Sequence, residues 1–266
     1  MPELPEVEWA RRRLEAGGLG RRIAAVDLRA PDMLEGARLA ALREALEAAA
    51  LTAARRHGKV LFARAGEGGP WLVMHFGMTG ALAIYGEAGQ EPGHARLVLD
   101  FADGGHLAFD NQRRFGRLEL ADDPDAHVEA AGLGPDALAI PREAFAARVC
   151  GGRGMIKPAL MDQEKIAGIG NVWSDEILFQ AGIAPDRRAD RLPAEARGRL
   201  FETMRRVLRE AAEAGADPAR LPGDWLRPHR DDDTCPRCGG PLERREVSGR
   251  TAHLCPGCQP PEEDDA

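Results

Sequence analysis

The chain begins Met1-Pro2-Glu3-Leu4-Pro5-Glu6, and a proline directly after the initiator methionine is a residue that can do chemistry. Methionine before a small residue is normally removed, which leaves Pro2 with a free secondary amine. An α-amine has a pKa of about 7.7–8.0, well below that of lysine, so a useful fraction is unprotonated at neutral pH. When such an amine attacks a sugar C1′, it forms a cationic iminium that draws electrons and thereby promotes elimination.

Glu3 stands next to this amine, and a carboxylate there can move a proton to the sugar ring oxygen or from C2′. The string also has a plainer interpretation. Met-Pro starts are common, and Pro5 sits where a proline is tolerated in the first turn of a helix. The N-terminal residues alone therefore leave two interpretations open, a nucleophile or an ordinary helix start.

A second reactive group lies near the other end of the chain, where four of the five cysteines form two Cys-x2-Cys pairs. Each pair offers two thiolates from one tight turn, and four thiolates suit a tetrahedral Zn²⁺ ion. We expect one structural zinc, with a pair of disulfides as the alternative. Cys150 lies in an apolar stretch and is expected to be buried. The predicted zinc ligands are Cys235, Cys238, Cys255 and Cys258.

The charge balance bears on whether nucleic acid is a partner. The net charge of −7 argues against it, because phosphate binding depends on lysine and arginine. However, acidic residues are concentrated at 231–233 and 262–265, whereas arginines are dense at 11–13, 113–117 and 205–209. Since a basic groove can coexist with an acidic back face, we expect nucleic-acid binding with a steeper salt sensitivity than usual.

Length and composition are those of an ordinary globular protein. The 266 residues suffice for two lobes, and 44% of them are hydrophobic and 30% charged. No apolar run approaches the roughly 20 residues of a membrane helix. The N-terminus lacks a basic patch followed by an apolar stretch, as a secretory signal would have. We expect a cytoplasmic protein (nucleoid-associated if prokaryotic), no membrane partner, and a monomer.

The elements that must position these groups follow from hydrophobic patterns. Residues 3–17 predict a helix, because apolar side chains recur on one face. Alternating runs at 96–101 and 106–110 flank Asp103-Gly104-Gly105, which predicts a hairpin. From about residue 135 the spacing becomes helical. The other expected strands are 60–63, 71–75 and 81–85, and the other expected helices are 141–150, 156–166, 172–180 and 193–214.

Four further motifs lie between the N-terminal string and the cysteines. They are His57-Gly58-Lys59; His75-Phe76-Gly77-Met78-Thr79-Gly80; Asn111-Gln112-Arg113-Arg114-Phe115-Gly116; and Asp162-Gln163 with Ala167-Gly168-Ile169-Gly170-Asn171. In this order, together with the N-terminal string and the cysteine module, they resemble the motifs of the formamidopyrimidine-DNA glycosylases of the Fpg/Nei family. The resemblance covers residues 2–259.

The resemblance implies a fold and a domain organisation. The expected fold is α+β, with an N-terminal helix plus a two-layer β-sandwich, a C-terminal helical helix-two-turn-helix lobe and a four-cysteine zinc finger. The expected domains are 2–131 (catalytic β-sandwich), 136–222 (helical DNA-binding domain), 230–260 (zinc finger) and 261–266 (acidic tail).

The resemblance also implies an activity. The chain is expected to be a bifunctional DNA glycosylase and abasic-site lyase of base-excision repair, acting on double-stranded DNA that contains damaged bases or abasic sites. Such an enzyme flips the damaged base out of the stack. Pro2 then attacks, and β,δ-elimination cuts the strand. Oxidised purines (8-oxoguanine and formamidopyrimidines) are the expected substrates.

Base flipping leaves a gap that apolar side chains can fill, as Met78 and Phe115 are suited to do, while Arg113 can hydrogen-bond the orphaned base. The plainer alternatives are core packing for the apolar side chains, a solvated face for the arginines, and a capped turn at Gly168–Asn171 instead of a phosphate-binding one. The expected site residues are catalytic Pro2, Glu3, Lys59 and Arg250, DNA-binding His75, Met78, Arg113, Arg114, Phe115 and Asn171, and Glu6 in the substrate pocket.

Residues 217–233 depart from the family pattern, in which a longer segment supplies a flexible loop over the flipped purine. A Nei-like preference for oxidised pyrimidines therefore remains open. Two rivals from other classes also remain: a non-catalytic relative that binds damaged DNA without cutting it, and a zinc-ribbon protein of the transcription apparatus. The last leaves the N-terminal string unexplained.

Overall fold

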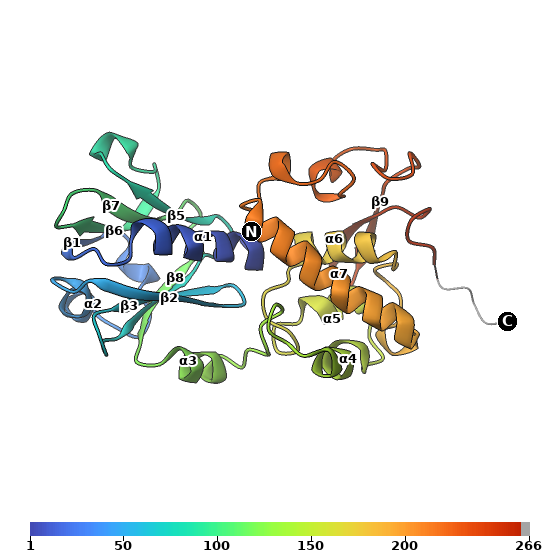
Figure 1. Ribbon diagram of the computed structural model, residues 1–266, viewed down its shortest axis with the longest axis horizontal. Helices are drawn as coiled ribbons and strands as arrows, with labels where there is room; N and C mark the ends of the chain where they lie inside the picture. The colour runs from blue at the N-terminus through green and yellow to red at the C-terminus, as the bar shows by residue number, and fades with distance from the viewer. Residues whose placement is uncertain (262–266) are drawn as a thin grey trace. The chain divides into compact units, whose positions relative to one another are not determined.

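The computed structural model describes residues 1–261, which divide into two compact units (Figure 1). Unit 1 comprises Met1–Pro2 and Glu6–Ala131, and unit 2 comprises Glu3–Pro5 and the chain from Gly132 onward. The chain passes from unit 2 into unit 1 within helix α1 (Leu4–Gly17). The acidic tail predicted over 261–266 lies, after residue 261, outside the described residues.

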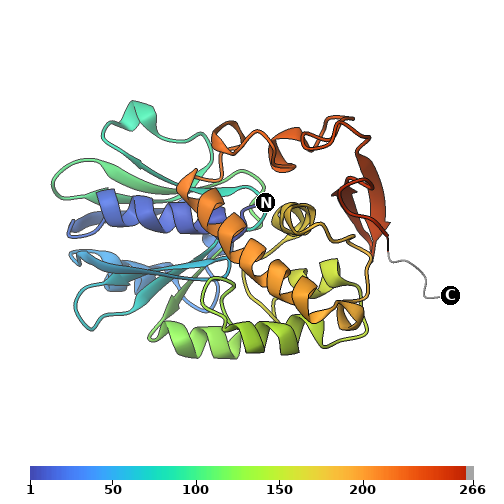
Figure 2. The ribbon, with the colours of Figure 1, turned by 45° about the vertical axis from the view of Figure 1, so that its right-hand side comes forward.

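Unit 1 contains two four-stranded antiparallel sheets, with strand orders β1-β6-β7-β5 and β2-β3-β4-β8. Apolar side chains from both sheets share one core, so the sheets form a two-layer sandwich, with α1 running alongside (Figure 2). Val7, Ala10 and Leu14 of α1 belong to this core, as the helical spacing predicts. The strands are β1 (Ile23–Leu28), β2 (Leu51–His57), β3 (Val60–Ala65), β4 (Trp71–His75), β5 (Gly80–Tyr85), β6 (Ala95–Phe101), β7 (His106–Asn111) and β8 (Arg117–Ala121).

Short helices complete unit 1, and its turns use glycines where the backbone requires them. Gly104 and Gly105, between β6 and β7, have φ values of 89° and 77°, a conformation that favours glycine. This explains why the hairpin could be predicted. The helices are α2 (Leu39–Leu46) and α3 (Pro124–Ala130), with the 3₁₀ turns η1 (Pro31–Met33) and η2 (Ala88–Gln90).

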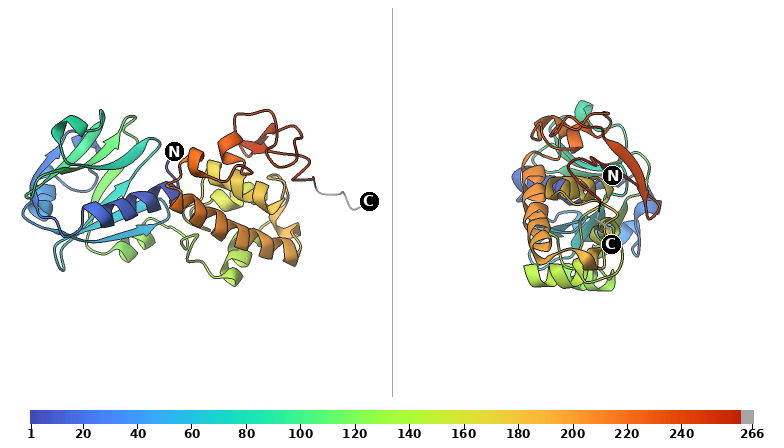
Figure 3. Two further views of the ribbon diagram at one scale, coloured as in Figure 1. Left: turned by 45° about the horizontal axis from the view of Figure 1, so that its top comes forward. Right: turned by 90° about the vertical axis from the view of Figure 1, so that its right-hand side faces the viewer.

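Unit 2 is a helical unit with one main core, in which the rings of Trp173 and Trp225 meet edge to face. Its longest helix, α7, packs on α6 (Figure 3). The helix predicted over 156–166 is wrong in its second half, because Asp162 and Gln163 turn their side chains onto the backbone N–H groups of Glu164 and Gly168 and end the helix. The helices are α4 (Arg142–Cys150), α5 (Ile156–Met161), α6 (Asn171–Ala181), η3 (Ala189–Arg191) and α7 (Ala194–Glu213).

After α7, a connector with two 3₁₀ turns, η4 (Pro218–Arg220) and η5 (Arg227–His229), leads to one hairpin. Strands β9 (Glu243–Val247) and β10 (Arg250–Leu254) pair antiparallel and join through Ser248 and Gly249, whose φ values are 49° and 73°. The cysteine pairs flank this hairpin. The predicted α+β class is confirmed. Within residues 1–261, no helix combines the length and apolarity needed to cross a membrane.

Candidate active site

The N-terminus presents its residues in very different environments. Met1 is exposed, with 54% of its surface accessible, and Pro2 is half-buried. Glu3 is buried, with 1% of its surface accessible. The half-buried Pro2 is therefore joined directly to a residue whose carboxylate is buried.

Helix α6 fixes that carboxylate within unit 2. The Glu3 side chain accepts hydrogen bonds from the backbone N–H groups of Gly170 (2.7 Å), Val172 (2.9 Å) and Trp173 (3.2 Å). These groups belong to the first turn of the helix, where N–H donors have no partner inside the helix and the dipole favours a negative charge. Gly170, the N-cap residue, has no side chain to satisfy them. Glu3, near the start of the chain, therefore caps α6.

The two glycines before α6 have a steric role that the sequence did not reveal. A Cβ on Gly170 would lie 2.4 Å from Cδ of Glu3, and one on Gly168 would lie 2.9 Å from Cβ of Leu4. Leu4 also donates its N–H to the Gly168 carbonyl at 2.9 Å. The motif thus accommodates the N-terminal residues of the chain itself. The capped turn considered for Gly168–Asn171 is present, with Gly170 as the N-cap residue and the Glu3 carboxylate as the capping group.

Lys59 occupies the tight turn between β2 and β3, which Gly58 enters with a φ of 54°. Arg56 holds this turn: its Nη1 donates to the Gly58 carbonyl at 3.1 Å, and its Nε donates to Glu8 at 3.1 Å. Glu8 also accepts from Arg11. Burial raises the pKa of Glu8, but the hydrogen bonds and charges of Arg11 and its arginine neighbours outweigh burial and lower the pKa to about 2. The turn carrying Lys59 is thereby tied to α1.

His75 ends β4 and pairs in register with Val60, beside the Lys59 turn. Burial, followed by the charges of Arg117 and Lys59, lowers the pKa of His75 to about 4. The imidazole is therefore neutral at pH 7. Its Nδ1 accepts the N–H of Gly77 at 3.2 Å, which leaves Nε2 as the protonated nitrogen and a neutral donor.

Met78 and Phe115 stand out as exposed large apolar side chains, with 41% and 56% of their surfaces accessible. They lie on two loops that are in direct contact, since a Cβ on Gly77 would meet the Phe115 carbonyl carbon at 2.3 Å. The guanidinium of Arg113 sits 5.1 Å from the Phe115 ring centre. The core-packing alternative for the two apolar side chains is therefore wrong.

Arg114 and Glu6 complete the predicted set in unit 1. Arg114 has a positive φ of 56°, and its side chain forms an exposed ion pair with Asp32. Glu6 is half-buried in the first turn of α1.

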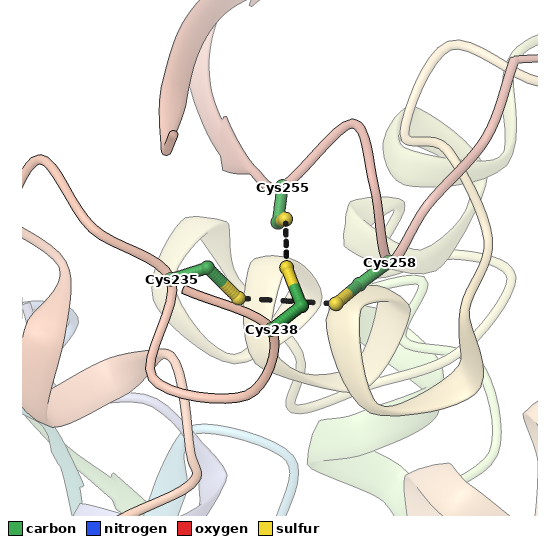
Figure 4. Close-up of side chains that lie close together, drawn as sticks. All are labelled: Cys235, Cys238, Cys255 and Cys258. Atoms are coloured by element: carbon green, nitrogen blue, oxygen red, sulfur yellow. Dashed lines mark hydrogen bonds between the residues drawn. The ribbon is translucent and has the colours of Figure 1, made fainter. Parts of the chain in front are cut away.

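The four cysteines beside the β9–β10 hairpin point toward one another (Figure 4). Their Sγ atoms all lie within 4.8 Å, with 3.8 Å between Cys235 and Cys258 and 3.4 Å between Cys238 and Cys255. Tetrahedral zinc with bonds of about 2.3 Å separates its sulfurs by about 3.8 Å, so this donor set fits zinc. The distances are far too long for disulfides, and none of the five cysteines forms one.

Cys150 is buried in α4, as predicted, and burial raises its pKa to about 11. In unit 2, Asn171 contacts the residue that follows Arg250, because its Nδ2 donates to the carbonyl of Thr251 at 3.1 Å. A buried group that the sequence patterns did not reveal lies beside them, formed by Lys157, Asp175 and Arg230.

Family models match nearly the whole chain. Residues 1–118 match the formamidopyrimidine-DNA glycosylase N-terminal domain. Residues 132–222 match the formamidopyrimidine-DNA glycosylase H2TH domain, and residues 232–261 match the zinc finger found in FPG and IleRS.

Relatives match over their full length. The formamidopyrimidine-DNA glycosylase of Solibacter usitatus is 37% identical over 270 residues, covering 97% of this chain and 99% of the relative. That of Thermus thermophilus is 39% identical, covering 97% and 98%. Lactococcus lactis Fpg in complex with N7-benzyl-Fapy-dG DNA is 27% identical, with a TM-score of 0.85 and coverage of 98% and 100%. The chain therefore belongs to the formamidopyrimidine-DNA glycosylase family of DNA repair enzymes.

Proposed function

We propose that this chain removes oxidised purines from double-stranded DNA and then cleaves the abasic site through an iminium on Pro2. The observation that carries the proposal is the fixed carboxylate of Glu3, the residue that one peptide bond joins to Pro2. The relatives support the substrate class, since Lactococcus lactis Fpg has been seen bound to Fapy-dG DNA and to abasic-site DNA.

In the proposed mechanism the Pro2 nitrogen lone pair forms a bond to C1′, and the glycosidic bond breaks. The base leaves with the electrons of the glycosidic bond and takes up a proton from water. Pro2 then gives its N–H proton to the Glu3 carboxylate, and the freed nitrogen lone pair expels O4′, which takes up that proton, to give the iminium. Loss of the C2′ proton expels the 3′ phosphate, and a second elimination, with loss of the C4′ proton, expels the 5′ phosphate. Glu3 delivers the O4′ proton and accepts the C2′ proton, and Glu6 supports the pocket.

The remaining residues grip and distort the DNA in this proposal. Lys59 and Arg250 are catalytic through their contacts with phosphates beside the lesion, and His75, Arg114 and Asn171 add further phosphate contacts. Met78 and Phe115 fill the gap left by the flipped nucleotide, which their exposure supports, and Arg113 pairs with the orphaned base.

Zinc would be held by Cys235, Cys238, Cys255 and Cys258. When bound, it supplies a cross-link that stabilises the β9–β10 hairpin; four thiolates fill a tetrahedral shell, so the site is structural. The hairpin in turn presents Arg250.

The connector favours oxidised pyrimidines as a second candidate substrate class. It is short and tightly anchored: Trp225 and Leu226 have 2% and 1% of their surfaces accessible. The Glu176 carboxylate accepts the N–H groups of Leu226 (3.2 Å) and Arg227 (2.6 Å). An anchored segment of this kind differs from the flexible loop expected over a flipped purine.

Strand cleavage of matched duplexes tests the function and ranks the substrates. Four labelled duplexes are compared: 8-oxoguanine, formamidopyrimidine, an oxidised pyrimidine and a pre-formed abasic site. We expect the duplexes with either purine lesion and with the abasic site to be cut. The duplex with the oxidised pyrimidine should be cut more slowly. Faster cleavage of the pyrimidine would favour the second candidate. If every duplex were bound and none were cleaved, the chain would be a non-catalytic relative that binds damaged DNA.

A further inference from the structure

A buried ionic cluster in unit 2 has no role in the mechanism above. Lys157 of α5 and Asp175 of α6 form an ion pair whose side chains are 0% and 1% exposed. Arg230 of the connector donates to the other carboxylate oxygen at 2.9 Å. Removing three charges from water is costly, and apolar replacements of similar volume often give an equally stable fold. Stability alone therefore does not explain this cluster.

The cluster reaches the hairpin that carries Arg250. Nζ of Lys157 lies 3.5 Å from the Thr251 carbonyl and 3.4 Å from the Asn171 carbonyl. The backbone N–H of His253 also donates to Asp175, and Nδ1 of His253 lies 2.8 Å from the Arg230 carbonyl. Strand β10 is thus held at the first and third residues after Arg250.

These contacts complement the cysteines. Zinc ligation would fix the hairpin at its open end, since Cys238 precedes β9 and Cys255 follows β10. The turn at Ser248 and Gly249, next to Arg250, lies at the opposite end of the two strands. Thr251 is held near that turn end by Lys157 and by Asn171 of α6, whereas His253 is held nearer to the cysteines.

We propose that Asp175 is a positioning residue, which locks strand β10 onto helix α6 through Lys157 and Arg230 and so holds Arg250 beside Asn171. The inference rests on the proposed role of Arg250. Asp175 is too buried to touch DNA and acts only through the hairpin. A long guanidinium contributes to a reaction only if its backbone is held in register, and a shift of about 1 Å can cost about 100-fold in rate.

A double-mutant cycle on the full-length zinc-loaded protein tests this. The variants are Asp175→Asn, Arg250→Ala and both together, assayed for turnover of an abasic duplex and for affinity to a tetrahydrofuran abasic analogue. Because Asp175→Asn leaves Lys157 without its buried partner, the apolar pair Lys157→Met with Asp175→Leu is measured as well. Glu202→Gln is the matched control, since it removes an exposed ion pair with Arg142 in the same unit.

We expect Asp175→Asn and the apolar pair each to lower turnover by about 10-fold, with the zinc content unchanged and with Glu202→Gln at the wild-type level. In the Arg250→Ala background, the same changes should have no further effect. An equal loss in both backgrounds would assign Asp175 a general structural role and overturn the inference. Full turnover of the apolar pair would also overturn it. If Arg250→Ala itself left turnover unchanged, the proposed role of Arg250 would fail first and the inference with it.

Discussion

The carboxylate of Glu3 accepts the backbone N–H of Gly170 at 2.7 Å, so the start of the chain is bonded to the start of helix α6. The two further N–H groups that Glu3 accepts make this carboxylate the cap of the helix. A capping contact of this kind typically contributes about 1 kcal/mol. The capping residue directly follows Pro2 in the chain.

Substituting Gly170→Ala tests whether the position of the Glu3 carboxylate matters. A Cβ there would lie 2.4 Å from Cδ and 2.5 Å from Oε1 of Glu3, so the carboxylate must move. We expect turnover of an abasic duplex to fall by about 100-fold while binding of the same duplex persists. Gly154→Ala is the matched control, since a Cβ there meets nothing within 4 Å. Equal turnover of the two variants would show that the Glu3 placement is not needed.

His75 provides a pH-dependent prediction. Its pKa is about 4 in the folded chain against 6.5 for the free side chain, so the unfolded state binds the proton more readily. The stability that neutral, buried His75 contributes is therefore fully present above pH 6.5 and is lost as the pH falls toward 4. Relative to His75→Gln, the free energy of unfolding of the wild type should drop by about 3 kcal/mol over this window.

Chemical denaturation at pH 7, 5.5 and 4 measures this difference. A difference between the two proteins that stays constant with pH would contradict a neutral, buried His75. Because the imidazole is neutral at pH 7, we also expect His75→Gln to leave the salt dependence of duplex binding unchanged.

Glu8 should stabilise the turn that carries Lys59. Its pKa of about 2 lies below the ordinary 4.5, so its contribution is present above pH 4.5 and is lost as the pH falls toward 2. At pH 7 we expect Glu8→Gln to lower the free energy of unfolding by about 3 kcal/mol and to reduce abasic-site turnover. Glu15→Gln is the control, because Glu15 pairs with Arg11 on the exposed face of the same helix. If Glu8→Gln were as stable and as active as Glu15→Gln, Glu8 would not be the residue that stabilises the Lys59 turn.

The zinc site gives a prediction about binding. Cys238→Ser removes one of the four thiolates, so we expect loss of zinc and weaker binding of duplex DNA. Cys150→Ala should keep one zinc ion per chain, because Cys150 lies in the core of unit 2 and outside the cluster. Zinc content by elemental analysis and affinity by titration are measured together. If the affinity for duplex DNA were unchanged after zinc loss, the hairpin would not be part of the DNA-binding surface.

Elements with strong local patterns could be predicted from the sequence. Strand β4 begins and ends where the apolar run 71–75 does, and the α6 boundary fell within one residue of the prediction. Strand β2 was missed, because its alanines and arginines are mostly half-buried and do not alternate. The end of α5 was missed for a different reason, since side-chain contacts of Asp162 and Gln163 competed with the helix.

The zinc ligands could be predicted because their spacing is local, whereas contacts between distant residues left no such pattern. The capping role of Glu3 depends on a partner 167 positions away. Lys157 resembles any lysine in an apolar helix until Asp175, 18 positions later, is seen to face it. The hydrogen bond that ties the Lys59 turn to helix α1 likewise joins Arg56 to Glu8 across 48 positions.

In the proposed mechanism, the processed N-terminus forms the covalent intermediate. Borohydride reduction during turnover of a labelled abasic duplex, followed by peptide mapping, tests it most directly. We predict a reduced adduct on the nitrogen of Pro2, with Met1 absent from the intact mass. An adduct on a lysine, or strand cleavage without any trapped adduct, would contradict this mechanism.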